Sequence, residues 1–391
     1  NKVASSANIE YHARLIAQKF IQRELIRVSN ECINKAYEDI DDVFYFVDDA
    51  TQKLAILESP FATNGGMSAQ DLALEELKRL EASMDLGAIV GTPTGFREFD
   101  LATKGLEASN KYLFAGRPGM GKTALVLQFL NNIAIEQGYF IGMFSLEMSA
   151  TQLVQRLGAA ISETRLDEVR SPGQMNPDQL VKYKKGIASL GDASFRIDDT
   201  AGISVQQVKS TVRAWKKKNP ELKGIIIDYI QLMTGGGKPE HRELEISAIS
   251  RGLKAIAKEF NIWVIELSQL SRAVETRGGA KIPQLSDLRE SGSLEQDADL
   301  VTFIYRPEYY GILEDEQGRS LRGLAELIIA KNRHGVTKRV KTRFDGDYMT
   351  FKDWDDNQQP DFSTKLNQKM TVIRSFDEDL PFDDEDIPWM K

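Results

Sequence analysis

The chain has 391 residues, of which 41% are hydrophobic and 28% charged, and its formal net charge is −8 at pH 7. This composition is ordinary for a globular protein, and the length exceeds what one hydrophobic core usually supports, so we expect more than one domain. A run of 18 apolar residues and a signal peptide are both lacking, which argues against a membrane span and favours the cytoplasm. The single cysteine, Cys32, excludes an intramolecular disulfide and fits a reducing compartment.

The charge is concentrated at one end of the chain. Residues 375–391 carry a net charge of −6, so the remaining chain carries only −2 and has room for local basic surfaces. We predict an acidic, disordered tail over 360–391, in which the pattern acid, aliphatic, proline, aromatic occurs at 379–382 and again at 386–389. The tail either keeps the protein soluble or docks into a basic pocket of a partner.

Two helices are predicted in the N-terminal part of the chain. Apolar residues recur every three or four positions over 5–38 and again over 43–57, and Asp-Ile-Asp-Asp separates the two stretches. We interpret residues 1–58 as an antiparallel helical hairpin. Because a lone hairpin cannot bury both apolar stripes, one face packs either on another subunit or on residues that precede Asn1, where we expect a missing part of the chain.

A linker is predicted over 59–92, with one short amphipathic helix at about 68–84. Ser68 and Asp71 form a capping-box-like start to this helix. A short helix between two flexible segments needs a surface to dock on. Either its own domain or a neighbouring subunit supplies that surface.

An α/β domain is predicted over 93–359. Apolar strands alternate with amphipathic helices, which indicates a mostly parallel sheet covered on both faces. Lys338 to Lys352 alternates as an edge hairpin with a turn at 345–347. The expected strands are 111–115, 139–145, 195–198, 224–230, 262–268, 300–305 and 325–330, and the expected helices are 124–130, 149–162, 176–190, 205–218 and 242–260.

A glycine-rich loop between the strand at 111–115 and the helix at 124–130 has the pattern G-x-x-x-x-G-K-T. In this context the pattern predicts a P-loop, whose backbone N–H groups and following helix N-terminus bind phosphate. We expect it to bind ATP with Mg²⁺, with the lysine on the phosphates and the threonine on the metal. The loop residues are Gly116, Arg117, Pro118, Gly119, Met120, Gly121, Lys122 and Thr123.

Three polar residues follow predicted strands and are candidates for the remaining chemistry. Asp228 ends a run of three isoleucines, where the second Mg²⁺-side carboxylate of a P-loop ATPase belongs. Glu147 follows the next strand after the P-loop and is a candidate general base, with a surface glutamate as the alternative. Gln269 follows the strand 262–268 and is a candidate sensor of the γ-phosphate.

Basic residues lie in three further segments. Lys331 and Arg333 follow the strand 325–330 and point the same way in an extended chain. No acidic residue accompanies them in sequence, so they are either a solvated loop or a pair that acts on a neighbour's γ-phosphate. The other two segments are rich in glycine and basic residues and poor in aromatics. They either bind a phosphate backbone without reading bases or are ordinary flexible surface loops. The first contains Arg272, Arg277 and Lys281, and the second contains Arg289, Glu290 and Gly292.

The set of motifs resembles the DnaB family of replicative DNA helicases over roughly 90–350. Besides the P-loop it comprises Phe144–Met148, Ile227–Leu232, Leu267–Arg272, Asp287–Gly292 and Ala330–Arg333. The resemblance implies a RecA-like ATPase in a homohexameric ring that encircles single-stranded DNA and moves 5′→3′, with primase and a helicase loader as partners. The globular head that begins family members is missing here, which leaves the arrangement of the N-terminal hairpins open.

The resemblance also implies residue roles. Glu147 is then the base, Asp228 the Mg²⁺-side carboxylate and Gln269 the sensor, while Lys331 and Arg333 act on ATP of the adjacent subunit. Arg289, Glu290 and Gly292 then lie in a DNA-contacting loop. The alternatives are a RecA-type recombinase, which forms filaments, and a KaiC-like regulatory ATPase, which shows no DNA-stimulated hydrolysis.

Overall fold

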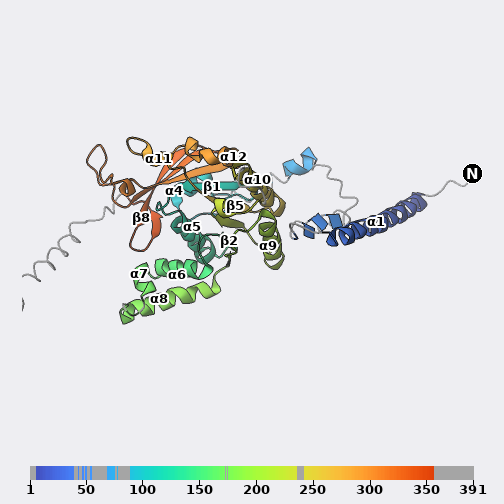
Figure 1. Ribbon diagram of the computed structural model, residues 1–391, viewed down its shortest axis with the longest axis horizontal. Coiled ribbons are helices and arrows are strands. Elements are labelled where there is room, and N and C mark those ends of the chain that lie inside the picture. The colour runs from blue at the N-terminus through green and yellow to red at the C-terminus, as the bar shows by residue number, and fades with distance from the viewer. Residues whose placement is uncertain are drawn as a thin grey trace, which may run out of the picture. The chain divides into compact units, whose positions relative to one another are not determined.

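The fold is described from a computed structural model of the chain (Figure 1). The structure describes residues 6–38, 43, 46–47, 49–50, 53–54, 68–74, 77, and 89–355 apart from 172, 174 and 236–241. The predicted tail over 360–391, most of the predicted linker and residues 236–241 lie outside the described residues. Residues 354–391 form a unit of their own, of which Trp354 and Asp355 are described.

The predicted long first helix is confirmed as α1, Ser6–Ala36. Several of its large apolar side chains are exposed, whereas Val28 is buried. The described residues of the second segment are helical, and Lys53 Nζ lies 2.5 Å from Glu31 Oε1 of α1. Further along, Ser68 Oγ accepts a hydrogen bond from the N–H of Asp71, as the predicted cap requires.

A nine-stranded sheet in the order β3-β2-β4-β5-β1-β6-β7-β8-β9 forms the centre of the α/β domain. The first six strands in this order are parallel, and β7, β8 and β9 continue antiparallel beyond β6. This confirms the predicted mostly parallel sheet with an edge hairpin. The strands are β1 Lys111–Gly116, β2 Ile141–Ser145, β3 Phe195–Asp198, β4 Gly224–Asp228, β5 Trp263–Gln269, β6 Leu300–Tyr305, β7 Leu324–Asn332, β8 Lys338–Asp345 and β9 Thr350–Asp353.

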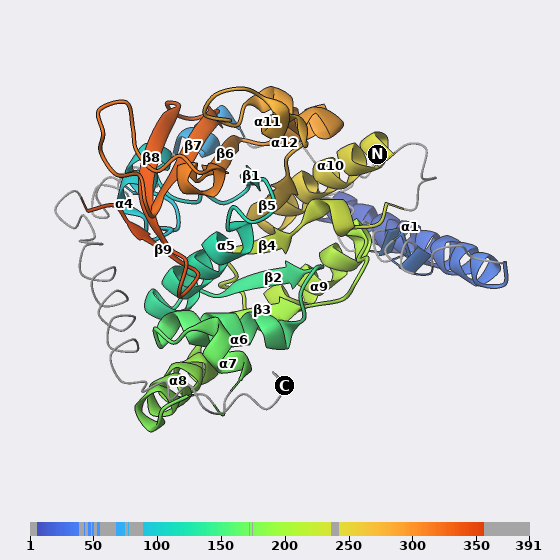
Figure 2. The ribbon, with the colours of Figure 1, turned by 60° about the vertical axis from the view of Figure 1, so that its left-hand side comes forward.

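The predicted helices after the P-loop are confirmed to within two residues at each end. Three of them begin with reciprocal capping boxes, at Ser149, Asn176 and Ser204. Both ribbon views show α6, α7 and α8 grouped together and α9 beside α10 (Figures 1 and 2). The helices are α4 Arg97–Thr103, α5 Lys122–Leu130, α6 Ala150–Ile161, α7 Leu166–Arg170, α8 Pro177–Ser189, α9 Val205–Lys218, α10 Arg242–Phe260, α11 Ala273–Thr276 and α12 Gly292–Asp297.

Short elements complete the chain, and the sequence patterns did not predict them. Besides α4, α7, α11 and α12, they are segments of three to seven residues of tighter or wider helix, too short to carry a clear periodicity. They are η1 Asn131–Glu136, η3 Leu190–Asp192, η4 Ile230–Leu232, η6 Leu285–Ser291 and η7 Pro307–Tyr310.

Two apolar layers cover the sheet, one on each face. Alternate residues of β1 point to opposite sides: Phe114 packs with α4 and α5, and Leu113 packs in the layer formed by α9, α10 and α12. In the first layer Phe114 and Phe129 meet edge to face with ring centroids 5.3 Å apart, and Phe96 lies 5.7 Å from Phe129. This aromatic cluster holds α5, and therefore the P-loop that precedes it, against the sheet.

Truncating the centre of this cluster should destabilise the α/β domain. Phe129 is fully buried, so Phe129→Ala removes a large apolar side chain and leaves a cavity, which should lower the free energy of unfolding by about 3–5 kcal/mol. Urea denaturation followed by circular dichroism measures the loss. The exposed Leu244 of α10 is the matched control, and Leu244→Ala should change the value by less than about 1 kcal/mol.

Candidate ATP-binding site

The P-loop connects β1 to α5, as predicted, and its backbone is shaped by glycines. Gly119 and Gly121 have positive φ angles of 79° and 94°, a conformation that other residues adopt only with strain. Space is also limited there, because a Cβ on Gly121 would lie 3.1 Å from the ring of Phe351 in β9. The antiparallel end of the sheet therefore supports the loop directly.

Lys122 begins α5 and points back across the loop, where its Nζ donates a hydrogen bond to the carbonyl oxygen of Gly116 at 3.0 Å. Burial lowers the pKa of Lys122, and the carboxylates of Asp228 and Glu147 partly oppose this effect. A buried ammonium held by one carbonyl is well suited to bind the oxygens of a phosphate, which would supply the missing negative charge.

Thr123 and Asp228 meet at the carboxyl ends of β1 and β4. The Thr123 hydroxyl donates to Asp228 Oδ2 at 2.9 Å, whereas Oδ1 is buried without a hydrogen-bond partner among the described residues. Burial raises the pKa of Asp228 to about 6. An orphaned carboxylate oxygen beside a hydroxyl is the oxygen-rich setting that Mg²⁺ prefers, so these two residues fit the predicted metal role.

Glu147 and Gln269 border the same region. Glu147 lies two residues beyond β2, whose last residue Ser145 is aligned with Asp228, and its side chain is exposed. Gln269 ends β5 and is aligned with Gly116 of the P-loop. The parallel register thus brings the predicted base and the predicted sensor to the edge of the sheet that holds the P-loop.

Lys331 and Arg333 lie at the other end of the sheet strands from the P-loop. Ala115, next to the P-loop, is aligned with Phe303 of β6, and Phe303 is aligned with Ile328 of β7. Because β7 runs antiparallel, Lys331 and Arg333 lie about 10 and 17 Å further from the P-loop along the strand direction. They cannot reach a nucleotide on their own chain.

The basic pair has partners that the sequence did not reveal. Arg333 Nη1 contacts Asp299 Oδ1 at 2.9 Å, and Lys331 Nζ donates to the carbonyl oxygen of Glu295 at 2.6 Å. The acidic partner is distant in sequence, and the β6–β7 pairing brings Asp299 close across 34 positions. Burial raises the pKa of Asp299, but hydrogen bonds from Lys254 and the N–H of Lys111 outweigh it, and the net shift is downward.

The predicted DNA-contacting residues divide into three groups. Arg272 is exposed, and Lys281 Nζ lies 5.3 Å from the centroid of the Tyr310 ring. Arg277 is already paired, because its guanidinium contacts both carboxylate oxygens of Asp287. Arg289 belongs to η6, whereas Gly292 begins α12; the side chains of 289–293, Glu290 included, lie outside the described residues.

Further residues around the P-loop were missed by the sequence reasoning. Arg306 Nη1 donates to the carbonyl oxygen of Gly119 at 3.2 Å, and the ring of Tyr309 lies against the same glycine. Arg156 of α6 is close enough for its charge to interact with those of Asp228 and Glu147. No local periodicity or motif in the sequence marks these residues.

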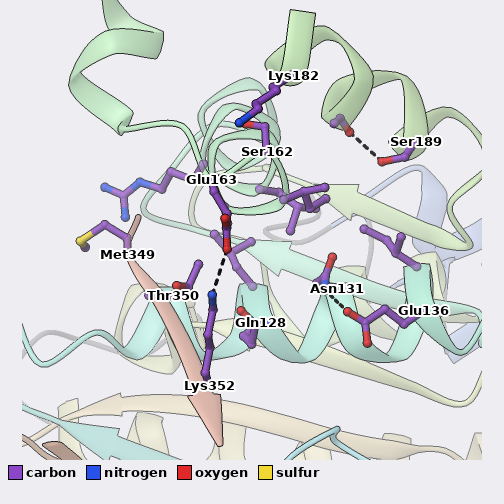
Figure 3. Close-up of a pocket in the computed structure, with 18 of the residues that line it drawn as sticks. Gln128, Asn131, Glu136, Ser162, Glu163, Lys182, Ser189, Met349, Thr350 and Lys352 are labelled. Atoms are coloured by element: carbon purple, nitrogen blue, oxygen red, sulfur yellow. Dashed lines mark hydrogen bonds and ion pairs between the residues drawn. The ribbon is translucent and has the colours of Figure 1, made fainter. Parts of the chain in front are cut away.

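A cavity of about 710 Å³ lies between α5, η1, α6, α8 and β9, and Arg156 is part of its lining. Figure 3 shows Lys352 of β9 reaching Glu163 just past α6, where the two form an ion pair of 3.0 Å. No predicted ATP-site residue lines this cavity. The cavity is lined by residues of α5 from Ala124 onward, whereas the predicted phosphate site uses Lys122 and Thr123 at the start of that helix.

The raised pKa of Asp228 makes a prediction about stability without Mg²⁺ and nucleotide. The unfolded carboxyl ionises near pH 4 and the folded one near pH 6, so burying the charge destabilises the fold fully above pH 6 and not at all below pH 4. Asp228→Asn should therefore raise the free energy of unfolding at pH 7.5 in EDTA by up to about 3 kcal/mol.

This gain should shrink as the pH falls and vanish near pH 4. Thermal denaturation of wild type and variant over this range measures it, with the exposed Glu316→Gln as the matched control. A constant difference at all pH values would contradict a burial effect.

The comparisons with known proteins agree with this geometry. The profile of the family described as "DnaB-like helicase C terminal domain" matches residues 91–353. Replicative DNA helicase DnaB of Geobacillus stearothermophilus is 38% identical over 351 residues, which cover 89% of this chain and 76% of that protein. Replicative DNA helicase DnaC of Bacillus subtilis (strain 168) is 37% identical over 90% of this chain and 76% of its own length.

Solved structures extend the likeness to the fold. One solved ATPase domain is 36% identical and superposes with a TM-score of 0.69, covering 74% of this chain and all of that domain. A DnaB-like replicative helicase, solved in a study of its interactions with primase, is 32% identical with a TM-score of 0.73 over 90% of this chain and 81% of that one. None of the described helices is long and apolar enough to cross a membrane. The chain belongs to the DnaB family of replicative DNA helicases, which are ATP-dependent enzymes.

Proposed function

We propose that this replicative helicase hydrolyses ATP at interfaces between neighbouring copies of the chain and uses the energy to move 5′→3′ along single-stranded DNA. The observation that carries this proposal is the separation of Lys331 and Arg333 from the P-loop of their own chain. Two cations at the far edge of the sheet complete a phosphate site only when a second chain presents its P-loop to them.

Each residue has a role that its surroundings support. Lys122 and the P-loop backbone bind the phosphates, and Thr123 and Asp228 hold Mg²⁺, which neutralises phosphate charge. Glu147 takes the proton of the attacking water, and Gln269 senses whether the γ-phosphate is present. Lys331 and Arg333 of the adjacent chain stabilise the charge that develops on that phosphate.

Head-to-tail contacts of this kind close into a ring, and we propose a homohexamer. In a ring, Arg272 and Lys281 of every chain, with Arg289, Glu290 and Gly292, face a common channel. Several modest basic loops then bind a DNA backbone although the chain as a whole is acidic. Arg277 is better explained as a support for this region, since Asp287 already neutralises it.

The domain assignment is part of the proposal. Residues 1–58 pair with the same hairpins of other chains, and the helix at about 68–84 docks on the neighbouring 93–359 domain. A primase is an expected protein partner, since the related helicase was solved in a study of its interactions with primase. A helicase loader is the second expected partner, and it rests on the family resemblance alone. The protein acts where the chromosome is replicated, in the cytoplasm.

A subunit-mixing experiment tests whether the basic pair acts in trans. Lys122→Ala and Arg333→Ala should each lower ATP turnover about a thousandfold, since each removes essential phosphate contacts. When the two inactive variants are mixed and allowed to exchange subunits, about one quarter of the interfaces combine an intact P-loop with an intact Arg333. Turnover should therefore reappear, measured as phosphate release.

Failure to recover turnover in rings shown to be mixed would contradict action in trans. Light scattering establishes that both variants form the same assembly as wild type. Unwinding is tested separately on forks with one single-stranded tail: wild type should open 5′-tailed forks, and Lys122→Ala should not. Activity restricted to 3′-tailed forks would overturn the proposed direction.

A further inference from the structure

One residue of the P-loop does not face the phosphate site. The side chain of Arg117 is buried and runs to the segment that follows β5. Its Nη1 donates to the carbonyl oxygen of Leu270 at 2.7 Å, while Nε and Nη2 lie 2.9 and 2.8 Å from Glu275 Oε1 in α11. All three guanidinium nitrogens are thus used to hold another segment, and the P-loop is tied to α11.

A second ion pair continues from this segment. Two residues after Glu275, Arg277 contacts Asp287 in η6 and also donates to the carbonyl oxygen of Ile282 at 2.8 Å. The N–H of Ser271 donates to the carbonyl oxygen of Asp287 at 3.1 Å. The segment 271–282 is therefore bound to the P-loop through Glu275 and to η6 through Ser271 and Arg277.

Aromatic residues make a parallel connection. The ring of Tyr309 lies against Gly119 of the P-loop and meets Tyr310 edge to face at 5.4 Å. Tyr310 stacks on Tyr305 at 6.2 Å, and the Tyr305 hydroxyl donates to the carbonyl oxygen of Ala280 at 2.5 Å. The P-loop and the segment 271–282 are thus in contact through two independent sets of side chains.

The segment also borders a cavity of about 390 Å³ that opens beside the ATP site. Its lining includes the buried Arg117, the predicted sensor Gln269 and the exposed Arg272. Gln231 Nε2 donates to the Ser268 hydroxyl at 2.8 Å on the same wall. The cavity therefore brings a P-loop residue, the predicted sensor and a predicted DNA-contacting residue to one place.

We infer that Arg117 and Glu275 form a coupling pair that transmits the state of the P-loop to the segment 271–282 and, through Arg277 and Asp287, to η6. Both are positioning residues in this role. The inference rests on the proposed function, because it assumes that these segments face DNA.

The Arg117–Glu275 contact can couple the two segments because a buried, paired charge holds its partners in a fixed geometry. A buried guanidinium with two hydrogen bonds and an ion pair cannot leave its partners without uncovering an unpaired charge, so the P-loop and α11 move together. Removing Glu275 leaves Arg117 with the Leu270 carbonyl alone. The P-loop then keeps its own backbone geometry, and the link to the following segment is lost.

Glu275→Ala is the test, because Glu275 lies outside the phosphate site. In the hexamer without DNA, kcat and KM for ATP should stay within about twofold of wild type. The stimulation of kcat by saturating single-stranded DNA should fall about fivefold or more, the range expected for coupling between sites. DNA affinity, measured by fluorescence anisotropy, should be unchanged, whereas Arg272→Ala should weaken it.

Conservative and matched variants complete the experiment. Glu275→Gln, which keeps a neutral acceptor for Arg117, should restore part of the stimulation, and the exposed Glu316→Ala should behave as wild type. Combining Arg117→Ala with Glu275→Ala should lower the stimulation ratio no further than Arg117→Ala alone.

Two results would overturn the coupling pair. One is full stimulation by DNA in Glu275→Ala. The other is loss of basal turnover or of assembly in that variant, which would indicate a structural role. Wild type that binds DNA without any stimulation would instead count against the proposed function.

Discussion

The pairing of β1 with β5 on one side and β6 on the other is the constraint on which the rest of the structure depends. Because these strands and β4 and β2 run parallel, their carboxyl ends meet at one edge, where Lys122, Thr123 and Asp228 come together. The same register sends the end of β7 to the opposite edge. The sheet therefore holds Lys331 and Arg333 apart from the P-loop of their own chain.

Much of this arrangement was predictable from the sequence. Buried strands such as Ile225–Ile227 are continuous apolar runs, amphipathic helices begin with capping residues such as Ser204, and the P-loop pattern has a physical meaning that depends only on local context. Asp228 was predictable for the same reason, since a strand end is visible in the sequence. The family resemblance supplied the roles of Glu147 and Gln269, which the patterns alone left open.

What escaped prediction depends on contacts between distant segments. The pairing of Arg333 with Asp299 arises from the β6–β7 register, and that of Arg117 with Glu275 from the path of the chain after β5. Neither has a signature in local periodicity or spacing. Arg277 is a further example. In the sequence it is one of several cations in a glycine-rich segment, whereas in the fold its charge is paired with Asp287.

The packing of Phe351 beneath Gly121 has a consequence for how the chain can be divided. The last strand of the sheet lies under the loop at the front of the domain, so the phosphate site is closed by residues more than two hundred positions away in sequence. A fragment that stops before β9 keeps every residue of the P-loop pattern, and Phe344 beside it, but loses Phe351, one of the two rings that lie against Gly121. The loop therefore has its full support only in a chain that extends through β9.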